Sequence, residues 1–174
     1  LTDSCIEGDM RVGGIVGYTR DYHHHKDGYI VACASYADAS IKANNTNGNA
    51  GGIAGYTLAD RNHTNTYMHI VGCLSLSNVD GKNKGAIIGC INHRQHTAGC
   101  VAVKNGTTKL YGTGQTSTEV GVTDAILYDA ANGATQEDVD KLNAAIAHYA
   151  SMNPPQEAKC NYTWTLVNGF PVLQ

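Results

Sequence analysis

The sequence predicts an all-β fold of stacked, glycine-rich repeats, a β-solenoid of the β-helix or β-roll kind. The first observation is a phrase that occurs at residues 13–18 (Gly-Gly-Ile-Val-Gly-Tyr), 51–56 (Gly-Gly-Ile-Ala-Gly-Tyr) and, less regularly, 85–90 (Gly-Ala-Ile-Ile-Gly-Cys). The second copy begins 38 residues after the first, and the third begins 34 residues after the second. Periods of this length are typical of repeat architectures, in which each unit buries its apolar side only against its neighbours.

The second observation is another phrase in phase with the first, with one cysteine in each copy. It runs over residues 30–36, 70–76 and 97–103, and it contains Cys33, Cys73 and Cys100. A fragment at residues 4–9, which contains Cys5, fits as the tail of an earlier unit. Each unit is therefore expected to hold a Gly-Gly strand and a cysteine strand, separated by polar loops rich in glycine and asparagine.

The repeated glycines indicate tight bends and close approach of neighbouring backbones, since glycine has no Cβ to obstruct either. The structural positions of this kind are Gly14, Gly17, Gly52, Gly55 and Gly89. In a stack, equivalent residues form columns. We expect one interior column of Ile15, Ile53 and Ile87, and another of Cys5, Cys33, Cys73 and Cys100.

The six cysteines are expected to pack as small apolar residues, because buried free thiols behave in this way. The alternative is a disulfide within the column, since neighbouring strands lie about 4.8 Å apart and that spacing permits a bridge. The sequence has no C-x-x-C spacing, which argues against a cysteine metal site.

The repeats are assigned to residues 1–121, and residues 122–174 are assigned to a C-terminal cap of the same domain. Residues 112–121 are expected to form a loop. A helix is predicted at about residues 136–152, with Thr135 as its N-cap and Asp138 completing a weak capping box. A hairpin is predicted at about residues 161–173 around the Asn168-Gly169 turn. We expect this unit to cover the open edge of the last repeat, with Trp164 packed on Val139, Leu142 and Ile146 of the helix.

These phrases resemble GLUG repeats, which occur in large bacterial surface proteins, including adhesin-like proteins and regions of bacterial immunoglobulin A peptidases. The resemblance covers about residues 4–103, and the ending Trp164 to Leu173 resembles the segment that closes many such arrays. The chain departs from the pattern where Ile stands in place of Leu, and in its third copy, where Ala86 and Cys90 intervene. The resemblance implies a secreted or surface-attached structural or adhesive module, and it implies no catalytic residues.

Composition sets limits on partners. The formal net charge is −3 and no basic stripe is present, which argues against nucleic-acid binding. No apolar run approaches the roughly 20 residues of a membrane-spanning helix. The chain starts inside what resembles a truncated repeat, so we expect a fragment of a larger secreted or cell-surface protein that is monomeric when excised. No cofactor is predicted.

Histidines form one candidate site, because most of them follow the Gly-Gly strands. If the repeats stack, the loops bring them to one edge of the solenoid. The candidate metal ligands are His23, His25, His63, His93 and His96. One interpretation is a transition-metal or pH-responsive site. The favoured interpretation is solvated loop residues, because the loops differ in length and flexible ligands rarely converge unaided.

Tyrosines form the other candidate site. The sequence has ten Tyr against one Phe and one Trp, and exposed Tyr beside Asn and His suits a sugar- or protein-binding face. The candidate binding residues are Tyr18, Tyr22, Tyr56 and Tyr67. The alternative is that these rings only pack along the outside of the repeats.

The sequence favours a non-enzymatic module that adheres to a host or environmental glycan or protein. One alternative is a glycan-active enzyme on a β-helix frame, which requires clustered carboxylates. Asp21, Asp27, Asp38 and Asp60 are instead scattered through loops, with no pair at matching repeat positions. The other alternative is an inert spacer within a larger surface protein.

Overall fold

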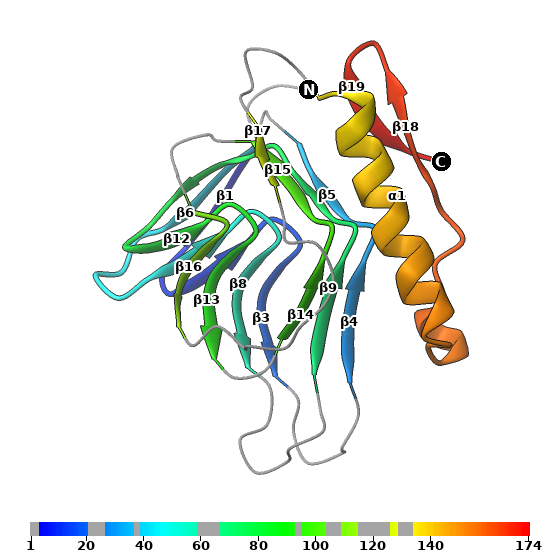
Figure 1. Cartoon of the computed structure of the whole chain (residues 1–174). Coiled ribbons are helices and arrows are strands. Elements are labelled where there is room, and N and C mark those ends of the chain that lie inside the picture. The colour runs from blue at the N-terminus through cyan, green and yellow to red at the C-terminus, as the bar shows by residue number, and fades with distance from the viewer. Residues whose placement is uncertain are drawn as a thin grey trace.

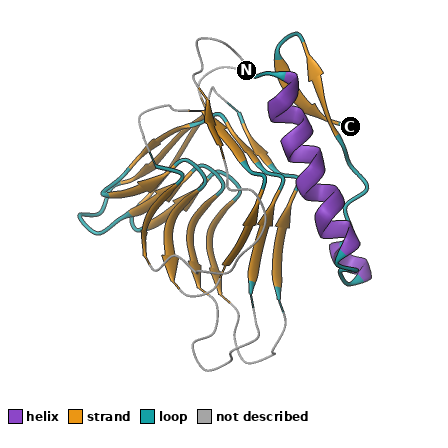
Figure 2. Cartoon of the chain, viewed as in Figure 1, coloured by secondary structure: helices purple, strands orange, loops and turns teal. Residues whose placement is uncertain are grey.

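A computed structural model describes residues 4–20, 27–36, 39–58, 67–92, 95–103, 109–114, 126–128 and 134–174 (Figure 1). This part of the chain is mostly β-strand, with a single α-helix against the strands (Figure 2). The all-β class predicted from the sequence is confirmed. Five sheets are parallel, and the sixth is an antiparallel pair near the C-terminus.

Successive passes of the chain contribute one strand each to the five parallel sheets. The first sheet holds β1 (Ser4–Gly8), β6 (Ala39–Ala43) and β11 (Asn78–Asp80). The second sheet holds β2 (Arg11–Gly13), β7 (Asn49–Gly51) and β12 (Asn83–Gly85). The third sheet holds β3 (Val16–Arg20), β8 (Ala54–Leu58), β13 (Ile88–Asn92) and β16 (Tyr111–Gly114).

The remaining two parallel sheets complete each pass. The fourth sheet holds β4 (Gly28–Val31), β9 (Met68–Val71) and β14 (Gln95–Ala98). The fifth sheet holds β5 (Ala34–Ser35), β10 (Leu74–Ser75), β15 (Val101–Val103) and β17 (Ile126–Tyr128). Copies of the Gly-Gly phrase lie side by side in register, with Gly51 paired to both Gly13 and Gly85.

A pass contains five short strands, so the expected unit of two strands joined by polar loops is wrong. The segments expected to be second loops include β6 and β11, each of which holds one large buried apolar residue, Ile41 and Val79. These two side chains form a small core with Val12, Ala43 and Ala50 between the first and second sheets. One large apolar residue in each segment is enough because the parallel neighbours supply the rest of the core.

Glycine brings the second and third sheets together at a sharp corner. A Cβ added to Gly17 would lie 2.6 Å from the carbonyl oxygen of Arg11, and one added to Gly55 would lie 2.5 Å from the backbone nitrogen of Val12. Backbone atoms occupy the equivalent space at Gly14, Gly52 and Gly89 as well. The Gly-Gly phrase is therefore explained by close backbone approach between β2 and β3 and between their counterparts.

The isoleucine column is present, but its first member is not buried. The backbone nitrogen of Ile15 donates to the carbonyl oxygen of Ile53, and that of Ile53 donates to Ile87. Ile53 and Ile87 are fully buried in the larger core, whereas Ile15 is 45% exposed. The reason is that every strand of the first pass lies at the edge of its sheet. Exposed large apolar residues between positions 4 and 36 are Ile6, Met10, Ile15, Tyr18 and Tyr36.

The cysteine column holds three members rather than four. Cys33, Cys73 and Cys100 lie at the bend between the fourth and fifth sheets, where Cys73 and Cys100 are buried and Cys33 is half-buried. Cys5 instead lies in β1, where it pairs with Ser40 and is exposed. The expectation for Cys5 was wrong because β1 belongs to the first sheet and not to the bend. All six cysteines are free thiols.

The C-terminal segment forms helix α1 (Gln136–Ser151), a short 3₁₀ turn η2 (Gln156–Ala158) and the hairpin β18 (Trp164–Val167) and β19 (Phe170–Leu173). Thr135 and Asp138 form a reciprocal capping box at the start of α1. Trp164 packs in one cluster with Val139, Leu142 and Ile146. No helix in the described ranges has the length and apolarity that crossing a bilayer requires.

Two expectations about this segment are corrected. The helix does not lie over the end of the stack but along its side, next to β9 and β15 (Figure 1). The cluster that it covers includes Ala32, Leu74 and Val101 from the sides of three successive passes. Residues 111–114 form β16, and the parallel strands continue past residue 121, since residues 126–128 form β17. Residues 111–114 were partly assigned to a loop because their Gly and Thr content is typical of turns.

Candidate functional site

The main candidate site is a group that we name the Arg-Tyr cluster, made of Arg11, Tyr18, Tyr56 and Asn92. Tyr18 of β3 and Tyr56 of β8 are register partners in the third sheet. Their ring centroids are 5.5 Å apart and the rings are tilted by 55°. The guanidinium carbon of Arg11 lies 4.3 Å from the Tyr18 ring centroid and 4.5 Å from that of Tyr56. One cation therefore contacts two aromatic rings from successive passes.

Strand alternation explains how Arg11 reaches the two rings. Val12 points into the small core with Ile41 and Val79, so Arg11 and Gly13 point to the opposite side of β2. That side faces β3, because Gly17 approaches the backbone of Arg11 without a Cβ between them. A cation over an exposed ring contributes about 0.5–1 kcal/mol, so the arrangement holds the guanidinium in place rather than stabilising the fold strongly.

Amide groups lie beside the cluster along the stack, with Asn92 and Asn83 partly exposed and Asn49 buried. Asn92 of β13 donates from Nδ2 to the Tyr56 hydroxyl at 2.7 Å. In the second sheet, Arg11, Asn49 and Asn83 are register partners. Asn83 donates from Nδ2 to Oδ1 of Asn49 at 3.0 Å. Aromatic rings beside guanidinium and amide groups are the combination that recognises polar ligands with flat apolar faces, such as sugars.

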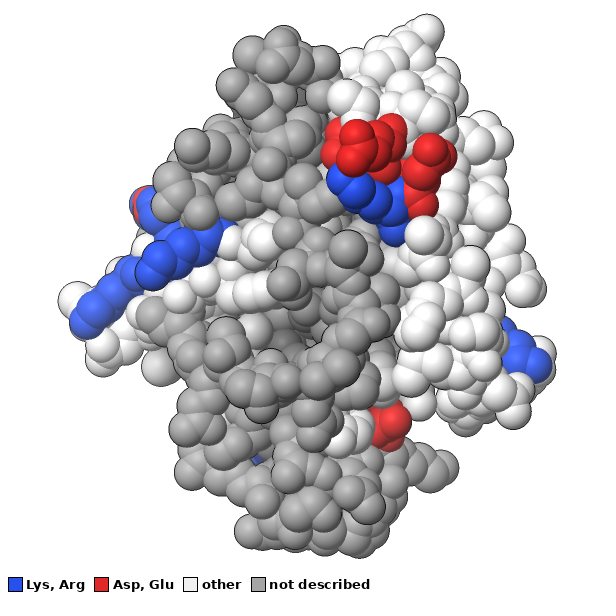
Figure 3. Space-filling view, viewed as in Figure 1, with Lys and Arg blue, Asp and Glu red and all other residues white. Residues whose placement is uncertain are grey.

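The charge of Arg11 is not neutralised within the described residues. Their ion pairs join Lys42 to Glu7, His69 to Asp27, Lys84 to Asp80 and Lys141 to Glu137. Figure 3 shows the last of these as red beside blue on the first half of α1. Arg11 is exposed, and within the described residues its side chain contacts the two tyrosine rings.

A second aromatic cluster lies on the fourth sheet under the C-terminal half of α1. Tyr29 and His69 are register partners whose rings stack at 5.1 Å with an interplanar angle of 10°. The Nε2 atom of His69 lies 3.2 Å from Oδ2 of Asp27, and Oδ1 of Asp27 accepts from the backbone nitrogen of Tyr67 at 2.7 Å. Tyr149 of α1 approaches both Tyr29 and His69, with centroid distances of 5.7 and 6.3 Å.

This second cluster joins the helix to the sheet and offers little access to a ligand. His69 is 4% exposed and Tyr149 is 3% exposed. Burial raises the pKa of Tyr149 well above its usual range, and the nearby Tyr29 and Asp27 raise it further. The hydroxyl of Tyr149 therefore stays neutral and donates to the carbonyl oxygen of Ala158 at 3.2 Å.

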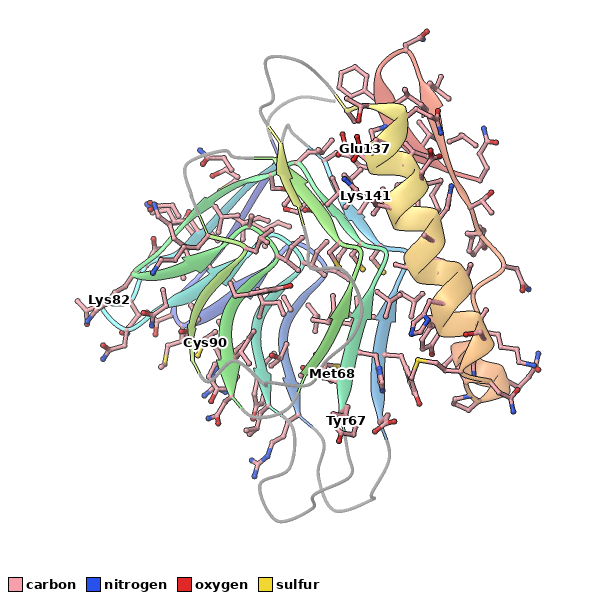
Figure 4. All side chains as sticks on the ribbon, viewed as in Figure 1. Tyr67, Met68, Lys82, Cys90, Glu137 and Lys141 are labelled. Atoms are coloured by element: carbon pink, nitrogen blue, oxygen red, sulfur yellow. The ribbon has the colours of Figure 1, made fainter. Side chains whose placement is uncertain are left out.

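The structure separates the predicted tyrosine face into parts. Tyr18 and Tyr56 lie together, whereas Tyr67 belongs to the second cluster. Figure 4 shows Tyr67 beside Met68 at the start of β9, away from Cys90 of β13, which pairs with Tyr56. Tyr22 lies outside the described residues. Tyr18 and Tyr56 lie in the third sheet and Tyr67 precedes β9 of the fourth sheet, so these three candidate binding residues do not form one group.

The predicted histidine site is mostly outside the structure as described. Four of the candidate ligands fall in segments that are not described: His23, His25, His63 and His93. The fifth, His96, lies in β14, where its backbone is the register partner of His69 in β9. Within the described ranges, no three or more His, Cys, Asp or Glu residues are arranged to hold a metal ion. This includes the column of Cys33, Cys73 and Cys100.

Arg11, Asn92 and His69 were not singled out from the sequence, and the contacts among Asp27, Tyr29 and Tyr149 were not expected. A signal for two of them was present, since Tyr29 and His69 stand four residues before Cys33 and Cys73 in matching phrases. Matching offsets predict stacked side chains on adjacent strands. Arg11 had no such signal, because its contact with the tyrosines depends on the angle between two sheets.

Comparisons of the chain with protein-family models, with curated protein sequences and with solved structures found no match. The function is therefore argued from the geometry of the chain itself.

Proposed function

We propose that this chain is a β-solenoid module of a secreted or cell-surface bacterial protein, and that it binds a glycan without catalysing a reaction. The five parallel sheets with repeat-matched register support a solenoid built from the GLUG-like phrases. In such a module, binding residues lie on the outside of the stack, because the inside is filled by small and branched apolar side chains.

The observation that carries the binding proposal is the position of Arg11 over both Tyr18 and Tyr56. Tyr18 is 37% exposed, so the part of its ring that Arg11 does not cover remains available to the apolar face of a sugar. The guanidinium and the Asn92 amide border this platform with polar hydrogens. Preorganised side chains lose less conformational freedom on binding, which favours a real site over a chance group of surface residues.

The test is a glycan array probed with the whole chain and with three variants. Tyr18→Ala removes the platform and is expected to abolish binding, and Arg11→Ala removes the cation and is expected to weaken it. Tyr162→Ala is the matched control, because Tyr162 is 60% exposed and lies in the C-terminal segment outside the Arg-Tyr cluster. Circular dichroism and thermal melting establish that each variant folds.

Two results would overturn the proposal. One is a folded wild-type chain that binds no glycan on the array. The other is binding that Tyr18→Ala and Arg11→Ala leave unchanged. Binding to a host protein in place of any glycan would contradict the proposal that the ligand is a glycan, but not the proposal that the Arg-Tyr cluster is a binding site.

A further inference from the structure

We infer that the Arg-Tyr cluster selects acidic sugars, in which a carboxylate is attached directly to a pyranose ring. This inference rests on the proposed glycan-binding function and names the ligand class for the same site. It follows from the charge and unpaired N–H groups of the Arg11 guanidinium, from its distance to the Tyr18 ring, and from the contacts that the nearby carboxylates make with other residues.

The first step concerns the charge of Arg11. A guanidinium is protonated at every physiological pH, and it carries five N–H groups in a planar fork. In the described part of the chain, the Arg11 side chain contacts two aromatic rings, and no ion pair or hydrogen bond of its guanidinium is found there. Ring contacts satisfy the cation partly, but they accept none of the N–H groups in the way that an oxygen does. The fork is therefore available for an external oxygen pair.

The second step concerns the carboxylates of the chain that lie closest in sequence. Glu7 accepts from Nδ2 of Asn44 at 2.6 Å and lies 3.9 Å from Nζ of Lys42. Asp9 accepts from Nδ2 of Asn45 at 3.3 Å. Both carboxylates contact the neighbouring pass, and neither forms an ion pair with Arg11.

The third step concerns geometry. The guanidinium carbon and the Tyr18 ring centroid are 4.3 Å apart, and Tyr56 supports the cation from the next pass at 4.5 Å. The guanidinium covers one face of the Tyr18 ring, so a pyranose packs against the part of the ring that stays exposed beside it, and a carboxylate on the sugar ring then reaches the cation from the side. The carboxylate then meets the guanidinium fork in the bidentate mode, which adds directionality as well as charge. A neutral sugar fills the same platform but leaves the fork to water.

The experiment measures affinity for two matched pairs of saccharides by titration calorimetry with the whole chain. The first pair is trigalacturonate and its methyl ester, and the second is sialyllactose and lactose. The pairs distinguish a uronic acid from a sialic acid as the source of the carboxylate. We expect the acidic member of at least one pair to bind about tenfold tighter or more, which is the size of effect that one bidentate charged contact supplies.

Variants separate the roles of the two side chains. Arg11→Gln is expected to reduce binding of the acidic sugar to the level of its neutral partner, while binding of the neutral sugar stays nearly unchanged. Tyr18→Ala is expected to weaken both members of the pair. Lys82→Gln is a control of equal charge change, because Lys82 lies in the turn between β11 and β12, labelled in Figure 4, and its Nζ contacts Oδ1 of Asn47 rather than a residue of the cluster. It is expected to leave the preference intact.

The outcomes are distinct. Equal affinity within both pairs would overturn the acidic preference and leave the proposed glycan binding in place. An acidic preference that persists in Arg11→Gln, or that disappears equally in Lys82→Gln, would also overturn it, since the effect would then come from general charge. No binding of any of the four saccharides by a folded chain that binds other glycans on the array would refute the inference alone. No glycan binding at all would refute both proposals.

Discussion

The indole Nε1 of Trp164 donates a hydrogen bond of 2.9 Å to the carbonyl oxygen of Gly72, a residue 92 positions earlier in the chain. Trp164 is 1% exposed and lies in the cluster with Leu74 and Val101. Asn143 of α1 fixes the same residue through its backbone, donating from Nδ2 to the Trp164 oxygen and accepting from the Trp164 nitrogen, both at 2.8 Å. The hairpin, the helix and the parallel sheets therefore meet at one tryptophan.

Replacement of Trp164 by alanine is expected to lower the free energy of unfolding by about 3–5 kcal/mol, the usual cost of removing a buried aromatic ring. The variant exposes the apolar side of the sheets, so light scattering is expected to show association during melting. Trp164→Phe keeps an aromatic ring in the core but leaves the Gly72 carbonyl without its hydrogen-bond donor. Its free energy of unfolding is expected to lie between those of the wild-type chain and Trp164→Ala. Tyr162→Ala serves as the exposed control. An unchanged melting temperature for Trp164→Ala would contradict this role.

Asn143→Ala is expected to cost about 1–3 kcal/mol, because it leaves both backbone groups of Trp164 unpaired in a partly buried place. Urea denaturation followed by circular dichroism measures the change. Glu137→Gln is the control on the same helix, since it removes only an exposed i,i+4 pair with Lys141 that is worth about 0.3–0.5 kcal/mol. Equal effects of the two substitutions would show that the Asn143 bonds add nothing.

Gly72→Ala tests how closely the helix approaches the sheets. Gly72 has φ +57°, and an added Cβ would lie 2.7 Å from the side chain of Ile146 and 3.0 Å from the carbonyl oxygen of Leu142. Ala32 occupies the equivalent bend with φ 51°, so the backbone conformation itself accepts alanine there. We expect Gly72→Ala to be less stable than Gly169→Ala, in which φ is +80° but nothing lies within 4 Å of the added atom.

The difference between these two variants, measured by thermal melting, isolates the contact with α1 from the backbone strain. A cost of about 1–3 kcal/mol beyond that of Gly169→Ala is expected for overpacking of this kind. Equal costs would indicate that the helix moves aside freely, and that its position over Gly72 is not fixed.

Much of the repeat organisation could be predicted because equivalent residues pair in register. The Gly-Gly copies and the three bend cysteines pack where their matching offsets place them. The number of strands per pass could not be predicted, since β6 and β11 each carry a single large apolar residue, Ile41 and Val79, in a segment that is otherwise polar or small. The packing of α1 along the side of the sheets also could not be predicted, because an amphipathic pattern shows which face of a helix is buried but not which surface of the protein it packs against.

The same distinction holds for the Arg-Tyr cluster. Tyr18 and Tyr56 could be paired from the repeat offset alone, whereas Arg11 depends on the corner between the second and third sheets. The contact of Asp27 with His69 likewise joins positions that do not match in the repeat. Matching positions in successive repeats predict which residues stack in one column. Contacts between residues of different columns depend on the angles between the sheets, which the repeat pattern does not contain.

The bend cysteines allow a prediction about reactivity. A hydrogen bond with the Cys73 thiol lowers the pKa of Cys33 to about 7, against the opposing effect of burial. Burial raises the pKa of Cys73 well above its usual range, and its neighbours Cys100 and Cys33 raise it further. Since the thiolate is the reactive form, Cys33 is expected to be alkylated at neutral pH well before Cys73, which is also inaccessible.

Iodoacetamide labelling followed by peptide mass spectrometry measures this order. The alkylation rate at Cys33 is expected to rise as pH passes through about 7 and then to level off, because with a pKa lowered to about 7 the side chain is mostly thiolate above that pH. In urea-unfolded protein the same cysteine is expected to show its midpoint near pH 8.5, the value of a free cysteine. Cys73→Ser, which replaces the thiol partner, is expected to shift the midpoint of Cys33 in the folded chain. A folded-state midpoint equal to that of the unfolded chain would show that the neighbouring cysteines do not lower the pKa of Cys33.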